Sequence, residues 1–205
     1  MRQSFSQGTQ RPCLRSGIGV IWLIGSAAMI VAAMSLVLET GWLTLCRSEA
    51  KVVAESAALA AARTWGQAVT DDAVARTTAK QRARTIVTGS LLDGSSTALV
   101  ALDAGLAASN DAAAVNNNSG CPSILPAVNT LILLGDYDQP TTVFRAGTVP
   151  TTSSRRASLV QFTVTLTSPF TSATRTVKAR AVAVWDGAAT PARSRLVGVS
   201  SVSCP

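Results

Sequence analysis

The feature that most constrains this chain is an uncharged, predominantly apolar run from Gly17 to Leu38. As an α-helix the run would be about 33 Å long, because each residue adds about 1.5 Å, and the hydrocarbon core of a bilayer is about 30 Å thick. A lone segment in lipid must satisfy its backbone hydrogen bonds internally, which leaves the helix as its conformation. The sequence therefore predicts a transmembrane helix over residues 17–38.

The charges on either side of this run predict its orientation. Arg2, Arg11 and Arg15 precede it with no acidic residue among them, and Glu39 follows it at once. Because basic residues are retained on the cytoplasmic side, we expect residues 1–16 to be a cytoplasmic basic leader at a bacterial inner membrane, with the rest of the chain extracytoplasmic. A cleaved secretory signal is the alternative, but the run is longer than a usual signal core and no small-x-small site directly follows it.

The helix is expected to continue beyond the lipid as a stem over residues 39–66. No proline interrupts the chain between Arg15 and Trp65, and Gly41 alone costs only about 1 kcal/mol of helix stability. Small and apolar residues then recur near one helical face: Leu43, Ala50, Ala54, Ala57, Ala61 and Trp65. Such a shallow stripe packs closely, so the stem is expected to cover a sheet or a partner helix.

Small residues also share a face within the predicted span, at Gly25, Ala28, Ala32 and Ser35. A face of this kind lets another membrane helix approach closely, which would permit a homo- or hetero-oligomer. Many spans carry small residues without pairing, so simple tolerance in lipid explains the face equally well.

Residues 67–186 carry the signals of an extracytoplasmic α+β domain. A helix is expected from about Asp71 to Val87, with Thr70 as its N-cap, and two later segments alternate between apolar and polar residues. The inward-facing positions of these two strands are Val160, Phe162, Val164 and Leu166, then Val177, Ala179, Ala181, Ala183 and Trp185. A hairpin through residues 168–173 would join the two strands, and their apolar face needs the stem as its cover.

The expected fold class is therefore α+β. A long N-terminal transmembrane helix would continue into an extracytoplasmic helix packed on a small antiparallel sheet, in a pilin-like roll. The last segment, residues 187–205, is expected to be a surface tail.

The composition argues against catalysis and against nucleic-acid binding. The chain has no histidine, which removes the commonest general base and metal ligand. Its formal charge of +7 is spread along the sequence without a nucleic-acid-binding motif. Asp136 and Asp138 lack the further oxygen ligands of a calcium loop, so they are assigned to a turn that ends a strand. No catalytic, cofactor-binding or metal-binding residue is predicted.

The cysteines divide across the predicted membrane. Cys13 would be cytoplasmic, whereas Cys46, Cys121 and Cys204 would lie outside, where disulfides persist. A Cys121–Cys204 bridge would tie the tail to the loop before the first strand. Whether the two residues bond stays open, because the sequence gives no distance between their Cα atoms.

The segment from Arg15 to Ala62 resembles the N-terminal region of TadG-like proteins of the Flp/Tad pilus-assembly system. The positions that carry the resemblance are Arg15 and Gly17, Glu39 and Gly41, and the alanine-rich stretch that begins at Glu55 and includes Ala57 and Ala58. The segments "LILLGDYDQPTTVF" and "VKARAVAVW" also resemble the extracytoplasmic part of short family members. Longer relatives carry a von Willebrand-type domain with a metal-binding Asp-x-Ser-x-Ser site, a motif that this sequence lacks.

The resemblance implies a non-enzymatic, single-pass membrane protein of a pilus-assembly or secretion apparatus. Its partners would be inner-membrane lipid and other pilus-assembly or envelope proteins, and no cofactor is implied. One alternative is a pilin- or pseudopilin-like fibre subunit that is cleaved after Gly17. Such subunits keep a glutamate at the fifth position after the cleaved glycine, where this chain has Trp22, and an indole cannot form the ion pair. The other alternative is a membrane-tethered, adhesin-like module, which would need a concave site with converging polar groups.

Overall fold

The computed structural model describes residues 16–103, 106, 130–147, 155–199 and 201–203. The helices are α1 (Ser16–Gly66), α2 (Ala73–Gly89) and α3 (Thr97–Val100), and the strands are β1 (Thr130–Asp138), β2 (Val143–Ala146), β3 (Arg156–Thr167), β4 (Thr174–Asp186), β5 (Arg193–Leu196) and β6 (Ser201–Ser203). The expected α+β class is confirmed.

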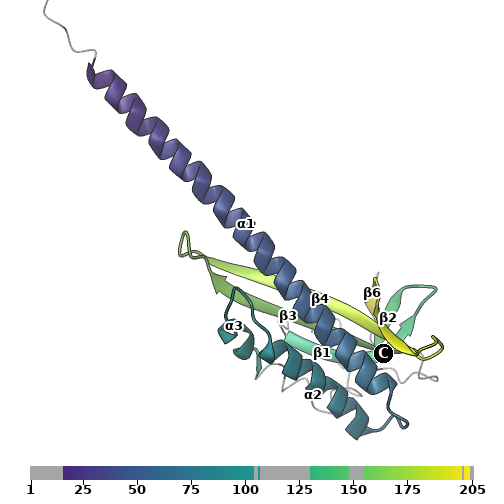
Figure 1. Ribbon diagram of the computed structural model, residues 1–205. Coiled ribbons are helices and arrows are strands. Elements are labelled where there is room, and N and C mark those ends of the chain that lie inside the picture. The colour runs from purple at the N-terminus through teal and green to yellow at the C-terminus, as the bar shows by residue number, and fades with distance from the viewer. Residues whose placement is uncertain (1–15, 104–105, 107–129, 148–154, 200, 204–205) are drawn as a thin grey trace, which may run out of the picture.

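Helix α1 is a single rod of 51 residues, as the continuity of the helical pattern predicted. Its N-terminal half projects away from the rest of the molecule, while its C-terminal half lies along the sheet (Figure 1). None of its most apolar 18-residue window is buried, and the helix is long and apolar enough to cross a membrane. The apolar side chains of the projecting half thus find no cover within the described part of the chain.

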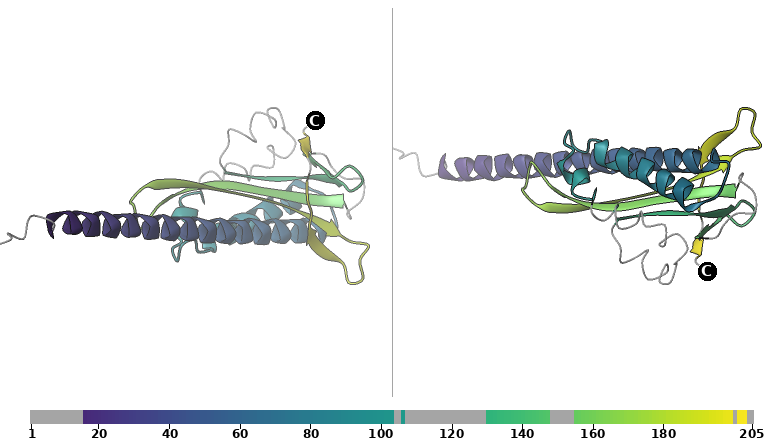
Figure 2. Two further views of the ribbon diagram at one scale, coloured as in Figure 1. Left: turned by 90° about the horizontal axis from the view of Figure 1, so that it is seen from above. Right: turned by 90° about the horizontal axis from the view of Figure 1, so that it is seen from below.

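The six strands form one sheet in the order β5-β4-β3-β1-β2-β6. Every neighbouring pair is antiparallel except β2 and β6, which run parallel, so the expectation of a purely antiparallel sheet was wrong. The expected tail supplies both outer strands, because β5 pairs with β4 at one edge and β6 pairs with β2 at the other. The three helices lie on one face of this mixed sheet (Figure 2).

The hairpin of β3 and β4 forms the floor on which α1 rests. The two strands pair from Ala157↔Val184 to Thr167↔Thr174, which confirms the predicted hairpin. Apart from Trp185, their predicted inward side chains belong to one buried cluster with Ala50, Ala54, Ala57 and Ala61 of α1, so the predicted cover of the sheet by the stem is confirmed. Alanine allows close approach, and in the middle of the contact Oγ of Ser158 donates a hydrogen bond of 2.6 Å to the carbonyl oxygen of Ala58.

The opposite face of the sheet is less polar than the strand pattern indicated. Leu159, Phe144 and Val184 are buried there in a second apolar cluster. Val197, Val199 and Val202 of the C-terminal segment are partly buried and pack against this cluster. The C-terminal segment therefore contributes apolar side chains to the domain's packing.

Two local expectations need correction. The N-cap of α2 is Asp72, whose carboxylate accepts a 2.7 Å bond from the amide of Ala75, while Thr70 only donates to Asp72. Strand β1 continues through Asp138, because residues 135–138 pair with β2, and the turn comes afterwards. Gly135 permits this pairing, since a Cβ there would lie 2.1 Å from the carbonyl oxygen of Arg145.

Candidate functional site

The most informative site lies where α1 leaves its apolar run and meets the tip of the β3–β4 hairpin. We call this site the junction; it comprises Glu39 of α1 and residues 168–175 of the hairpin. Glu39 is only 5% exposed, although it is a charged residue directly after the apolar run. A buried carboxylate must be compensated by hydrogen bonds or opposite charge, and the hairpin supplies both.

Three side chains of the hairpin bind the Glu39 carboxylate. Nε of Arg175 donates to its Oε1 at 2.9 Å, and the hydroxyl of Thr171 donates to its Oε2 at 3.1 Å. The hydroxyl of Ser168 makes a further, short hydrogen bond to Oε2. The bonds from Ser168 and Arg175 lower the pKa of Glu39, against the opposing effect of burial. The ionised carboxylate therefore fastens the hairpin tip to α1.

The same serine also shapes the hairpin tip. Oγ of Ser168 accepts hydrogen bonds from the amides of Phe170 (3.2 Å) and Thr171 (3.3 Å). The amide of Ser168 bonds to the carbonyl of Ala173 at 2.9 Å, which closes the turn. One residue thus orders the loop and links it to Glu39.

A second contact fixes the turn after α2 to the same end of the stem. Nε1 of Trp42 donates to Oδ1 of Asp93 at 2.9 Å, and the amide of Asp93 donates to Oε2 of Glu49 at 2.9 Å. Trp42 lies one helical turn beyond Glu39, so two separate loops converge on the first turns of the stem.

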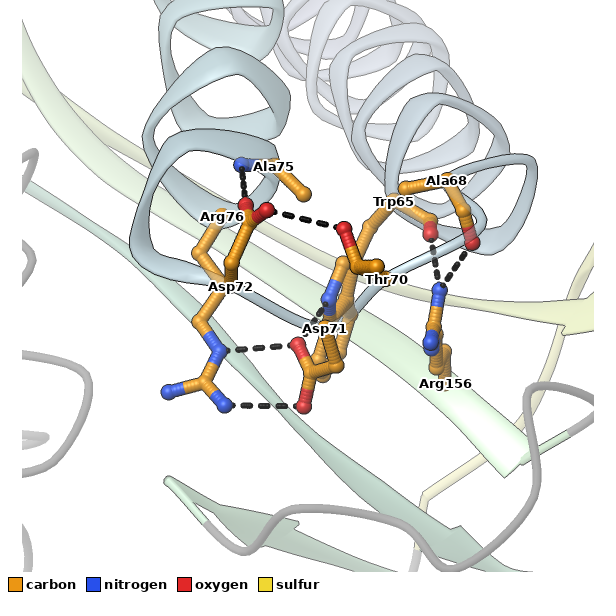
Figure 3. A network of polar contacts seen from close by, with 8 residues as sticks. All are labelled: Trp65, Ala68, Thr70, Asp71, Asp72, Ala75, Arg76 and Arg156. Carbon is orange, nitrogen blue, oxygen red and sulfur yellow. Dashed lines mark hydrogen bonds and ion pairs between the residues drawn. The ribbon is translucent and has the colours of Figure 1, made fainter.

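At its other end α1 is held by a polar network (Figure 3). The guanidinium of Arg156 donates from Nη1 to the carbonyl oxygens of Trp65 (2.6 Å) and Ala68 (2.9 Å), and it lies 5.7 Å from the centroid of the Trp65 ring. A cation at this position satisfies free carbonyl groups and favours the helix dipole. Arg156 therefore caps the C-terminus of α1 from strand β3.

Asp71 joins the two helices at this corner. Its carboxylate accepts bonds of 2.8 Å from Nε1 of Trp65 and from both Nε and Nη2 of Arg76 (Figure 3). Burial acts to raise the pKa of Asp71, but the bonds from Arg76 and Trp65 outweigh it and lower the pKa. Beside this network, Gly66 allows the ring of Trp185 to approach: a Cβ at Gly66 would lie 2.0 Å from its Cγ.

This arrangement couples the projecting helix rigidly to the sheet. Polar contacts hold α1 at both ends of its contact with the domain, and close-packed alanines fill the region between them. In the part of the chain that the structure describes, no three Cys, Asp or Glu side chains are placed to hold a metal ion.

The residues singled out from the sequence fall into distinct environments. Ala57 and Ala58 are fully buried, Glu39 forms the junction, and Glu55 makes only an ion pair of 3.7 Å with Lys51. Gly41 faces open space. Of the small-residue face in the projecting half, Gly25, Ala28 and Ala32 are exposed and Ser35 is partly exposed.

The remaining residues singled out from the sequence lie at the edge of the described residues or beyond it, except for Cys46. Arg15, Cys13, Cys121 and Cys204 lie outside the described residues, and so does the predicted disulfide. Gly17 lies within α1, but its surroundings are not described. Cys46 is a free, buried thiol, and burial raises its pKa to about 11.

Several residues that hold the site together were not predicted. Ser168, Thr171 and Arg175 sit in or next to a segment that reads only as a turn, and Arg156 reads only as a strand residue. One available signal was the single acidic residue placed directly after the apolar run. A carboxylate at that position needs a partner, and the basic residue nearest the hairpin tip supplies it.

A comparison with known families finds a match to the N-terminal part of the chain. Residues 17–64 match the family model described as "Putative Flp pilus-assembly TadE/G-like". The match covers the projecting half of α1, Glu39 and most of the stem, and it confirms the resemblance seen in the sequence. This is a family of structural and assembly proteins, which points to involvement in pilus assembly. No curated protein and no solved structure matches the chain.

Proposed function

We propose that this chain is a single-pass inner-membrane protein of a Flp/Tad-type pilus-assembly or secretion apparatus, and that it acts as an anchored docking component. The observation that carries the proposal is the division of α1 into a projecting apolar half and a half buried on the sheet. The family match spans both halves. The projecting half would anchor the protein in lipid, and the α+β domain, a curled sheet in the manner of a pilin-like roll, would be displayed outside the cytoplasm.

The orientation of this anchor follows from the charges around it. Three arginines precede the apolar run, and no acidic residue occurs before Glu39. An alkaline phosphatase fusion after Arg63 should be active, because that enzyme requires the extracytoplasmic compartment to form its disulfides. An inactive fusion, with a fusion before Gly17 active instead, would reverse the proposed topology.

The outward face of the stem is the proposed docking surface. Leu38, Leu45 and Val52 are each more than half exposed and recur every seven residues, with Gly41 between the first two. A seven-residue spacing keeps apolar side chains on one side of a helix, which suits packing against a partner helix. The stripe begins at the end of the proposed span, so a helix of another assembly protein or of a second copy could follow it out of the membrane.

Site-specific photocrosslinking in the native envelope tests this surface. A photoreactive residue at Leu45 should capture a defined partner, namely another pilus-assembly protein or a second copy. The control is Val74, an apolar residue on α2 that is 73% exposed, against 54% for Leu45, and that should capture neither. Identical patterns from the two positions, or no adduct from Leu45, would contradict the proposed docking face.

A fibre subunit cleaved after Gly17 is the second candidate, because a half-bare helix attached to a head domain would also suit packing into a helical fibre core. Trp22 argues against it, because its neutral indole cannot form the ion pair that the glutamate of such subunits makes at this position. Sequencing the N-terminus of the mature protein separates the two. A chain that starts at Ile18 would favour the fibre subunit, whereas an intact leader supports the permanent anchor.

A surface-binding module remains a third candidate on one structural ground. A cavity of about 450 Å³ opens at the end of the sheet far from the projecting helix and is lined by Asp138, Arg155, Asp186 and Arg195, among others. The arginines pair with neighbouring carboxylates, as in the 3.0 Å contact of Arg155 with Asp136. Their mutual neutralisation leaves little charge for a ligand, which places this candidate behind the docking role.

A further inference from the structure

Phe170 at the tip of the β3–β4 hairpin is a large apolar side chain that is only partly covered. It is 48% exposed, although the loop that carries it is well fixed by Ser168. The neighbouring tip residues, Thr171 and Ser172, are also exposed. An ordered loop that presents an aromatic ring among hydroxyl groups has the mixed character of a side chain placed at a lipid–water interface.

The junction fixes the height of this loop along α1. Ser168 and Thr171, on either side of Phe170, both bind the carboxylate of Glu39. Glu39 follows directly on Leu38, the last residue of the uncharged run. Figure 1 shows the hairpin tip reaching beyond α3 towards the projecting half of α1. The tip of the hairpin is therefore held at the level where the proposed span ends.

We propose that Phe170 inserts into the headgroup region of the bilayer beside α1 and forms a second, peripheral contact with phospholipid. This inference rests on the proposed membrane anchor and adds a lipid-binding role for the hairpin. Arg175 supports it, because its side chain is 46% exposed and its guanidinium carries N–H donors beyond the one that binds Glu39. Those donors would face lipid phosphate groups, while Thr171 and Ser172 lie among the polar headgroups.

The anchor helix and the contact of Phe170 with lipid would together fix the tilt of the domain relative to the membrane. A single helix leaves the domain free to tilt, whereas an anchor and a side contact define its inclination to the membrane plane. The stem would then present Leu45 and Val52 in a constant direction to partners in the membrane. Interfacial Trp, Tyr, Lys and Arg side chains fix tilt and rotation in membrane proteins, and Phe170 together with Arg175 would act in the same way.

Quenching of tryptophan fluorescence by brominated lipid tests the proposal on the full-length protein. Phe170→Trp is reconstituted in phosphatidylcholine vesicles with and without bromine near the glycerol end of the acyl chains. Val69→Trp is the matched control, since Val69 is 99% exposed and lies past the far end of α1. The emission of the parent, which has four tryptophans, is subtracted from both.

The emission added by Phe170→Trp should be blue-shifted and lose most of its intensity in brominated vesicles, while that added by Val69→Trp should be unchanged. Equal, negligible quenching of both would overturn the proposal. The parent supplies the separate check, because Trp22 lies in the proposed span. Quenching of the parent without quenching at position 170 defeats only this inference, whereas an unquenched parent defeats the membrane anchor itself.

Discussion

Glu39, the first acidic residue of the chain, accepts a 2.9 Å hydrogen bond from Nε of Arg175, a strand residue 136 positions further along the chain. The contact ties the end of the apolar run to the hairpin on which the stem rests. Glu39 therefore has a structural role, which its position and charge in the sequence did not by themselves reveal.

Replacing Glu39 by alanine should release the hairpin tip while leaving the sheet folded. Ser168, Thr171 and Arg175 would lose their shared acceptor, so the amides of residues 168 and 170–174 should exchange faster with solvent and the melting temperature should fall. Hydrogen exchange read by mass spectrometry measures the first effect. Glu55→Ala is the control, because its exposed pair with Lys51 contributes only about 0.3–0.5 kcal/mol. Equal protection of the tip in parent and Glu39→Ala would contradict the role assigned to the junction.

Acid should weaken the domain through the same carboxylates. The pKa values of Glu39 and Asp71 are lowered in the folded protein, so ionisation of both groups stabilises the native state above the ordinary carboxyl pKa values of 4.5 and 3.8. That stabilisation is lost as the pH falls through the lowered values. Urea unfolding at neutral and at acidic pH should therefore show a smaller loss of stability for Glu39→Gln than for the parent. An identical loss in both proteins would contradict the assignment.

Gly66 should tolerate no side chain, whereas Gly41 should. A Cβ at Gly66 would lie 2.0 Å from Cγ of Trp185, so Gly66→Ala should cost about 1–3 kcal/mol through displacement of the ring. Gly41→Ala meets nothing within 4 Å and should gain up to about 1 kcal/mol from its helical propensity. Denaturant unfolding of the two variants measures the contrast. Equal stabilities would show that Trp185 does not pack on Gly66.

Arg156→Ala should loosen the far end of α1. Its loss leaves the carbonyl oxygens of Trp65 and Ala68 without their charged donor, which should cost about 1.5–3 kcal/mol. Arg63→Ala, which removes an exposed arginine from the last turn of the same helix, should cost less than about 1 kcal/mol. Thermal unfolding followed by circular dichroism compares the two. A comparable loss in both variants would indicate that general charge near the helix end, rather than the specific cap, is what matters.

Short-range periodicity predicted much of this architecture. The alanine stripe of α1 and the alternation of β3 and β4 are local patterns, because helical and extended backbones repeat their side-chain directions every few residues. The patterns therefore predicted both the elements and the faces by which they meet. The uncharged run likewise predicted the projecting half of α1, since its length and polarity depend on no distant residue.

Long-range pairings could not be predicted in this way. The hydrogen bonds of Glu39 join residues about 130 positions apart in the chain. A turn sequence such as "SPFTSA" does not indicate which distant residue it will contact. The parallel pairing of β6 with β2 depends on how the chain returns across the sheet after β5. Asp and Thr are both favourable N-cap residues, so the sequence alone does not decide between Asp72 and Thr70. The path of the preceding loop places Asp72 at the cap of α2.

The central claim is that α1 holds this protein permanently in the membrane while the domain stays outside the lipid. Extraction of isolated membranes with alkaline carbonate, followed by detergent, tests it most directly on the full-length chain. We predict that the protein remains in the membrane pellet through carbonate treatment and enters solution only with detergent. Recovery of the intact protein in the carbonate supernatant, or in the soluble fraction after cell breakage, would contradict the claim.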